Sequence, residues 1–213
     1  LDNPRETLSD QPGFDRQETA AGSARLDWSL GSGLAVEALL SHVDADLDYG
    51  FDEDWSFEGI CEAFECIFDG YSSFDRYRRE NRNTTLDVRL LSDGAVDRPA
   101  WVLGAYGRDQ QQDLRRSYTF FAEDFLSEFE TESRALYGQL DWPAGERWVV
   151  KAGLRFEQRD ADYLDSDGAR FSPDDEEWGG RLALEYRSDA DHLLYGLVSR
   201  GYRAGGVNSD SIV

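Results

Sequence analysis

The most regular stretch of the sequence runs from Arg147 to Gln158, RWVVKAGLRFEQ, and alternates apolar with charged positions. The apolar positions are Trp148, Val150, Ala152, Leu154 and Phe156. Because side chains alternate sides along a strand, the stretch predicts a β-strand with one apolar and one charged face. A soluble sheet would turn the apolar face toward a core, and a membrane barrel would turn it toward lipid. The period alone leaves both alternatives open.

The same period recurs along the chain and predicts an all-β, antiparallel meander of about eight strands. The predicted elements are a hairpin from Arg25 to Val43, a strand from Asn83, a strand from Trp101, a strand over Glu132–Trp142, the strand described above, a strand around Arg181–Arg187 and a strand over His192–Tyr202. No helical period competes with this pattern.

The connections between the predicted strands differ in length. Short turns are expected at Gly31–Gly33, Ser92–Pro99, Pro143–Glu146 and Ser188–Asp191. Loops are expected over the first twenty residues and over the polar stretches 44–73, 110–126 and 160–176. Tryptophans lie beside the short turns, at positions Trp28, Trp101, Trp142 and Trp148. Short turns at one end, long loops at the other and an aromatic girdle favour a barrel in an outer membrane over a soluble sandwich.

Composition narrows the classes of partner. The net charge of -22, from 44 acidic and 22 basic residues, works against nucleic acid as a ligand, because phosphates would be repelled. No run approaches 18 apolar residues, which excludes a membrane-spanning helix. The aromatic share of 13% argues against disorder. The sequence begins at Leu1 without an initiator Met or a leader, so we expect a fragment or a mature segment.

The chain has two cysteines, Cys61 and Cys66, in the same acidic and aromatic stretch. Their closeness predicts a disulfide formed in an oxidising compartment, and two unpaired loop thiols are the alternative.

No catalytic or metal-binding constellation emerges from the sequence. Asp44, Asp46 and Asp48 suggest calcium, but Tyr49 and Trp55 stand where an EF-hand needs Gly and Glu. A solvated acidic loop is the better interpretation, so we predict no metal site, no cofactor and no enzymatic activity.

Several segments together resemble the barrel of TonB-dependent outer-membrane receptors of the iron-complex type. They are SRGYRAGGVN from Ser199, WGGRLALEY from Trp178, AGLRFEQ from Ala152, TTLDVRLLSD from Thr84 and the hairpin that leads into the aspartate-rich stretch after His42. The ordered series covers roughly Arg25 to Asn208. The resemblance implies a closed barrel of about 22 strands around a plug. Residues 1–213 would then be about a third of that barrel, an open fragment without the plug domain.

The resemblance also implies a function and a location. The whole protein would be a multi-pass β-barrel in the outer membrane of a Gram-negative bacterium, in contact with outer-membrane lipid and lipopolysaccharide. It would import a ferric siderophore or a similar iron complex, driven by the TonB complex through the plug. Aromatic residues of the longest loop are the candidates for ligand binding: Trp55, Phe57, Phe64, Phe68 and Tyr71. The alternatives are a receptor of the same fold for another nutrient, such as a glycan or cobalamin, and a structural barrel without transport.

Overall fold

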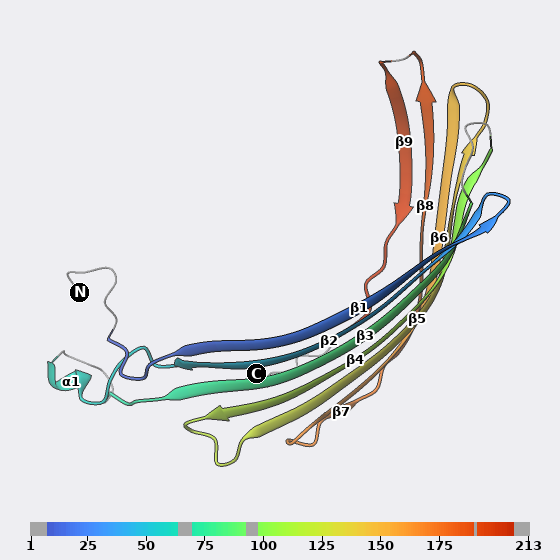
Figure 1. Cartoon of the computed structure of the whole chain (residues 1–213). Coiled ribbons are helices and arrows are strands. Elements are labelled where there is room, and N and C mark those ends of the chain that lie inside the picture. The colour runs from blue at the N-terminus through green and yellow to red at the C-terminus, as the bar shows by residue number, and fades with distance from the viewer. Residues whose placement is uncertain (1–7, 64–69, 93–97, 190, 207–213) are drawn as a thin grey trace.

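The computed structural model describes residues 8–63, 70–92, 98–189 and 191–206, and it folds them into one open, strongly curved antiparallel sheet (Figure 1). The strands are β1 (Phe14–Gly31), β2 (Leu34–Asp52), β3 (Phe74–Ser92), β4 (Ala100–Tyr118), β5 (Phe125–Pro143), β6 (Trp148–Asp165), β7 (Arg170–Phe171), β8 (Asp174–Arg187) and β9 (Leu193–Arg200). Their order in the sheet is β1-β2-β3-β4-β5-β6-β8-β9, and the short β7 pairs with β6. The predicted meander of about eight strands is confirmed.

Apart from the sheet, the described residues form one short helix, α1 (Ile60–Ala63). None of their helices combines the length and the apolar character needed to cross a membrane.

The two faces of the sheet follow from the strand register. Directly paired residues share a face, so a row can be traced from strand to strand across the sheet. One row is apolar throughout: Leu26, Ala38, Val88, Ala105, Leu136, Phe156 and Trp178. The adjacent row on the opposite face carries Asp27, Glu37, Arg89, Tyr137 and Arg155. The alternation in the sequence thus divides the sheet into an apolar and a polar face.

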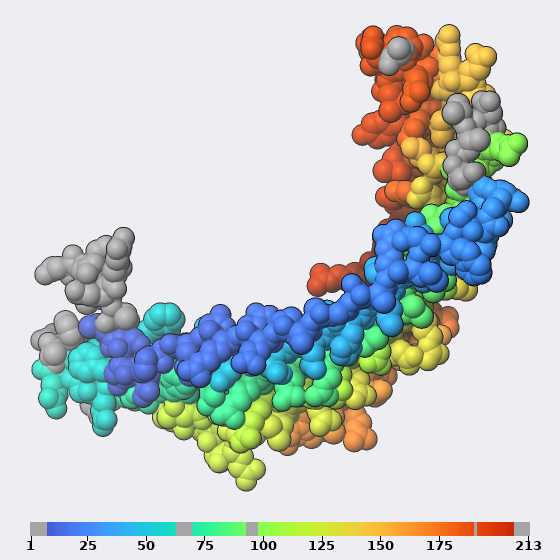
Figure 2. All heavy atoms as spheres, in the orientation of Figure 1, coloured from blue at the N-terminus to red at the C-terminus, as the bar shows by residue number. Residues whose placement is uncertain are grey.

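The polar face is the concave one. Along β5 the buried residues all belong to it, among them Ser127, Ser133 and Ala135, whereas Leu136 on the apolar face is 66% exposed. Side chains two strands apart also meet there: the Tyr137 hydroxyl on β5 donates a hydrogen bond to Asp87 on β3. Curvature brings side chains together on the inside of a sheet and spreads them apart on the outside. The described chain forms a single curved layer (Figure 2).

The strands run well beyond the segments that the sequence predicted. β1 begins at Phe14, inside the expected N-terminal loop, and β2 continues to Asp52. β4 ends at Tyr118 and β6 at Asp165, so most of the loops expected over 110–126 and 160–176 are strand. These predictions were wrong because both faces become polar there. The apolar alternation then disappears from the sequence, although the backbone ladder continues.

The acidic charge of the chain gathers on the convex face of these strand extensions. From β1 to β5 one row there carries a carboxylate on every strand, Glu18, Asp46, Glu80, Asp113 and Glu128, and Leu164 continues it on β6. Toward the other end of the same face the rows become apolar. Beyond them the short turns begin, for example at Gly31, Ser32 and Gly33, whose φ angles of 76°, 57° and 78° make a tight left-handed turn. Trp28, Trp101, Trp142 and Trp148 lie at this end, as predicted.

Candidate functional site

The candidate site lies at the end of the sheet opposite the short turns, which we call the long-loop end. The connection between β2 and β3, residues 53–73, and the connection between β4 and β5, residues 119–124, meet there. A backbone hydrogen bond from Thr119 to the Phe74 carbonyl, 3.1 Å long, ties the second connection to the first residue of β3, directly after the first connection. Of the predicted ligand-binding residues, Trp55, Phe57 and Tyr71 lie in the first connection. Phe64 and Phe68 lie outside the described residues.

Four aromatic rings form a cluster at the long-loop end, which we call the rim cluster: Tyr71, Tyr118, Phe120 and Phe121. Phe120 makes edge-on contacts with Tyr71 at 5.6 Å and with Tyr118 at 5.5 Å between ring centroids. Phe121 contacts Tyr118 at 5.2 Å. Tyr71 is 49% exposed and Phe120 is 60% exposed. The cluster therefore offers open aromatic surface that a ligand can contact.

Arg116, near the end of β4, contacts the rings of the rim cluster and fixes their position. The Arg116 guanidinium donates to both carboxylate oxygens of Asp75, and its shortest contact is 2.7 Å from Nη2 to Oδ2. It also lies over the rings of Tyr77, Tyr118 and Phe121, with 5.0, 5.8 and 5.4 Å to the centroids. Asp75 is only 1% exposed. A buried bidentate pair enclosed by aromatic rings fixes where the surface rings stand.

Trp55 is presented to solvent by a strained backbone. Its φ is 54°, in the left-handed region that a bulky residue rarely adopts, and its side chain is 69% exposed. The Asp52 carboxylate accepts a hydrogen bond from the Trp55 amide at 3.2 Å. The same carboxylate accepts bonds from the Ser9 hydroxyl and from the Asp10 amide, so it ties the N-terminal segment to this connection.

Carboxylates line the same connection. Asp54 Oδ1 accepts hydrogen bonds from the Ser73 amide and hydroxyl at 3.0 and 3.2 Å, and Glu53 Oε2 accepts from the Ser73 and Tyr118 hydroxyls at 2.8 and 3.2 Å. Asp54 Oδ2 is buried without a hydrogen-bond partner among the described residues. Burial raises the pKa of Asp54, and the neighbouring Asp52 carboxylate raises it further. This part of the site therefore favours neutral or positive groups.

The predicted disulfide falls partly within the described chain. Cys61 lies in α1 and is disulfide-bonded. Cys66, its expected partner, lies outside the described residues. A bridge at this position would brace the connection that carries Trp55 and Tyr71.

Further along the concave face, two tyrosines anchor polar networks. The Tyr137 hydroxyl donates to Asp87 at 2.8 Å and accepts from Arg89 Nε at 2.9 Å. The Tyr202 hydroxyl donates to Glu157 at 2.5 Å and accepts from Arg155 Nε at 2.9 Å. These charges are satisfied by one another, so the middle of the face is a rigid polar lining.

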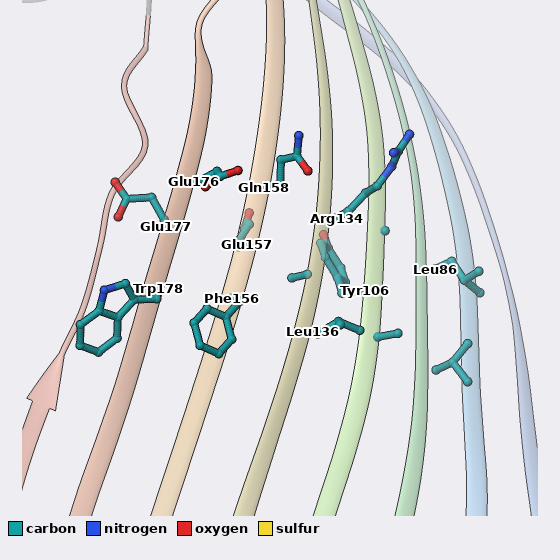
Figure 3. A pocket seen from close by; sticks show the side chains of 14 residues that line it. Leu86, Tyr106, Arg134, Leu136, Phe156, Glu157, Gln158, Glu176, Glu177 and Trp178 are labelled. Atoms are coloured by element: carbon teal, nitrogen blue, oxygen red, sulfur yellow. The ribbon is translucent and has the colours of Figure 1, made fainter.

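A groove of about 840 Å³ lies on the convex face, away from the rim cluster. Figure 3 shows Leu86, Leu136, Phe156 and Trp178 across neighbouring strands, with Arg134, Gln158 and Glu176 beyond them. The small side chains of Ala105 and Gly107 leave the hollow between these walls. Because its apolar walls, such as Leu136, Phe156 and Trp178, belong to the convex face, we do not place the functional site there. Among the described residues, no group of three or more His, Cys, Asp or Glu side chains is arranged to hold a metal ion.

Sequence reasoning named Tyr71 and Trp55 as candidates and did not name Phe120, Phe121 or Arg116. The aromatic run YTFF from Tyr118 to Phe121 was the available signal. It lies in a stretch that the sequence predicted as a polar and aromatic loop, and nothing in the sequence placed it beside Tyr71.

Comparison with solved structures gives the same architecture. The ferric yersiniabactin uptake receptor FyuA from Yersinia pestis aligns with a TM-score of 0.77 and 16% identity, over 94% of this chain and 30% of that chain. The siderophore receptor PiuA from Acinetobacter baumannii aligns with 0.69 and 14%, over 89% and 33%. The copper transporter OprC aligns with 0.66 and 16%, over 90% and 31%. The chain thus spans about a third of these receptors.

At such identities the structural matches establish the fold alone. The family assignment comes from the sequence: the family described as "TonB dependent receptor-like, beta-barrel" matches residues 1–212. The matched proteins are receptors and transporters, not enzymes. This chain belongs to the TonB-dependent receptor-like β-barrel family.

Proposed function

We propose that the chain forms part of the barrel of an outer-membrane receptor that imports a ferric siderophore or a similar iron complex. The observation that carries the proposal is the exposed rim cluster, which stands on a sheet whose two faces suit a membrane barrel. No covalent chemistry is assigned to any residue of the chain.

The convex face supports the location in a membrane. In β6 its apolar positions run from Trp148 to Phe156, close to the about 9–11 residues that a tilted barrel strand needs to cross a bilayer. Beyond Phe156 the convex positions turn polar at Gln158 and Asp160. With the short turns on the periplasmic side, the strand extensions and the rim cluster project outside the cell.

The rim cluster supports ligand capture. Iron complexes of siderophores present organic, partly apolar surfaces, and aromatic rings offer contact area at little cost in conformational entropy. In the complete receptor the ligand would lie between the rim cluster and the plug. Transport would draw its energy from the TonB complex acting on the plug, in keeping with the family.

The test is iron-limited growth of a strain with and without the complete receptor gene, on a panel of ferric siderophores. Growth restored by one siderophore supports the proposal and identifies the ligand class. A variant Phe120→Ala, produced and inserted at the normal level, should weaken that growth, and Phe14→Ala on the convex face is the matched control.

Growth that is the same with and without the gene on every iron complex would refute iron uptake. The family assignment would stand, and the same strain pair would then be tested for uptake of copper, cobalamin or a glycan. Copper is included because the copper transporter OprC shares the fold.

A further inference from the structure

At the long-loop end, the arginines and the carboxylates differ in how far they are engaged in ion pairs. The charges that stay open to a ligand determine which ligands the rim cluster accepts.

The arginines at this end are withdrawn from a ligand. Arg116 is enclosed by Asp75 and three aromatic rings, and its side chain is only 13% exposed. Arg79, in the adjacent row of the concave face, is half-buried and also engaged. Arg16, Arg78 and Arg115 share a row on the convex face, turned away from the rim cluster. An anionic ligand at the rim cluster would find no open arginine among these five.

Asp75 is paired with Arg116, but three other carboxylates of this end stay outside any ion pair of the described residues. Glu53, Asp54 and Asp10 accept hydrogen bonds from hydroxyl and amide groups, and within the described ranges they form no ion pair. Glu53 accepts directly from the Tyr118 hydroxyl of the rim cluster at 3.2 Å. The groups that donate hydrogen bonds to these carboxylate oxygens are neutral, so the negative charge is not cancelled.

Aromatic faces attract cations through their quadrupoles, and nearby carboxylates add a longer-range attraction for positive charge. We propose that the long-loop end selects iron complexes that carry a positively charged ammonium group and discriminates against polyanionic complexes. The identification of the ligand as an iron complex rests on the function proposed above, whereas the preference for positive charge rests on the rim cluster and its carboxylates.

The test is isothermal titration of the purified complete receptor with three probes. Ferrioxamine B carries a free ammonium group, its N-acetyl derivative is the same chelate without that charge, and ferric enterobactin is a tris-catecholate polyanion. At low ionic strength we expect ferrioxamine B to bind about two- to fivefold more tightly than the acetylated chelate. We expect it to bind at least about tenfold more tightly than ferric enterobactin, because the carboxylates beside the rim cluster repel a polyanion. Salt should reduce both differences.

Two variants test whether the preference for positive charge comes from the carboxylates beside the rim cluster. Glu53→Gln and Asp54→Asn keep an acceptor oxygen for the bonds from Ser73 and remove one negative charge each. Each should reduce the advantage of ferrioxamine B over its acetylated form by about twofold and leave binding of the acetylated form nearly unchanged. Glu130→Gln removes a charge from the convex face and should change neither value.

Equal or tighter binding of ferric enterobactin would overturn the inference, and so would an acetylation that has no effect at low salt. Binding of none of the three probes would overturn it as well. Growth that is independent of every iron complex, together with a retained preference for the ammonium probe, would refute iron uptake and support the charge preference. The two proposals therefore fail separately.

Discussion

Gly104 should be the glycine of the concave face that tolerates a side chain least. It pairs directly with Tyr137 on the neighbouring strand, and the tyrosine ring lies over it. A Cβ at position 104 would lie 2.2 Å from Cζ of that ring, whereas ordinary contacts begin near 3.4 Å. The clash involves the far end of the ring, so the ring turns away and the backbone stays. When the ring turns, the Tyr137 hydroxyl loses its hydrogen bonds with Asp87 and Arg89.

The cost of Gly104→Ala follows from those two contacts. Both are hydrogen bonds between the Tyr137 hydroxyl and a charged group, at 2.8 and 2.9 Å. Hydrogen bonds to charged groups contribute about 1.5–3 kcal/mol each. Asp87 and Arg89 remain paired with each other, which retains part of that free energy. Replacing Gly by Ala in a strand returns about 0.5–1 kcal/mol. We therefore expect a net loss of about 2 kcal/mol in the free energy of unfolding.

Urea unfolding of the complete receptor in detergent measures this loss. Gly107→Ala, in the same strand with nothing within 4 Å of the added methyl, is the matched control and should gain about 0.5–1 kcal/mol. Tyr137→Ala should cost about as much as Gly104→Ala, and the double variant should cost no more than either one, because both remove the same contacts. Additive losses, or equal stability of Gly104→Ala and Gly107→Ala, would refute the reasoning.

Three further outcomes are expected. The folded state holds the pKa of Asp54 above its ordinary value of about 4, so the stability that this group contributes is complete below that value and is lost as pH rises through the raised pKa. Asp54→Asn should therefore slow proteolysis of the connection between β2 and β3 at neutral pH and remove the part of its pH dependence that Asp54 contributes, and faster cleavage would contradict this. Leu154→Arg on the convex face should cost about 2–4 kcal/mol in folding into lipid vesicles, against Leu154→Val as control, and unchanged folding would speak against a lipid-facing position. Phe120→Ala should weaken ligand affinity by about fivefold in titration, as expected for truncation of an exposed aromatic contact, and an unchanged affinity would exclude Phe120 from the binding surface.

The parts of the fold that the sequence predicted are those where one face is apolar and the other is not. The alternation from Trp148 to Phe156 gave the position and the facing of β6 because each side chain had a distinct environment. In the second half of the same strand, from Gln158 to Asp165, most residues on both faces are polar. Periodicity carries no information there, and only backbone pairing with β5 and β8 shows that the strand continues.

The candidate site was predicted only as far as composition allowed. Tyr71 and Trp55 stood out as aromatic residues in an acidic stretch, which is unusual for a solvated loop. The contact between Tyr71 and Phe120 joins residues of two different connections, so it depends on the register of β3 with β4. Register is a property of the assembled sheet, and no local pattern in a two-sided polar strand specifies it.

The net charge of the chain predicts a ligand preference only when the charged residues are assigned to the two faces of the sheet. As a total, -22 predicts attraction of cations to any part of the surface. The register places a row of five carboxylates on the convex face of the extensions, where a ligand inside the barrel would not meet them. On the concave face the charges of the middle are paired, as between Arg155 and Glu157. At the long-loop end, Glu53 and Asp54 form no ion pair within the described ranges, so ligand preference should respond more to those two residues than to the total charge.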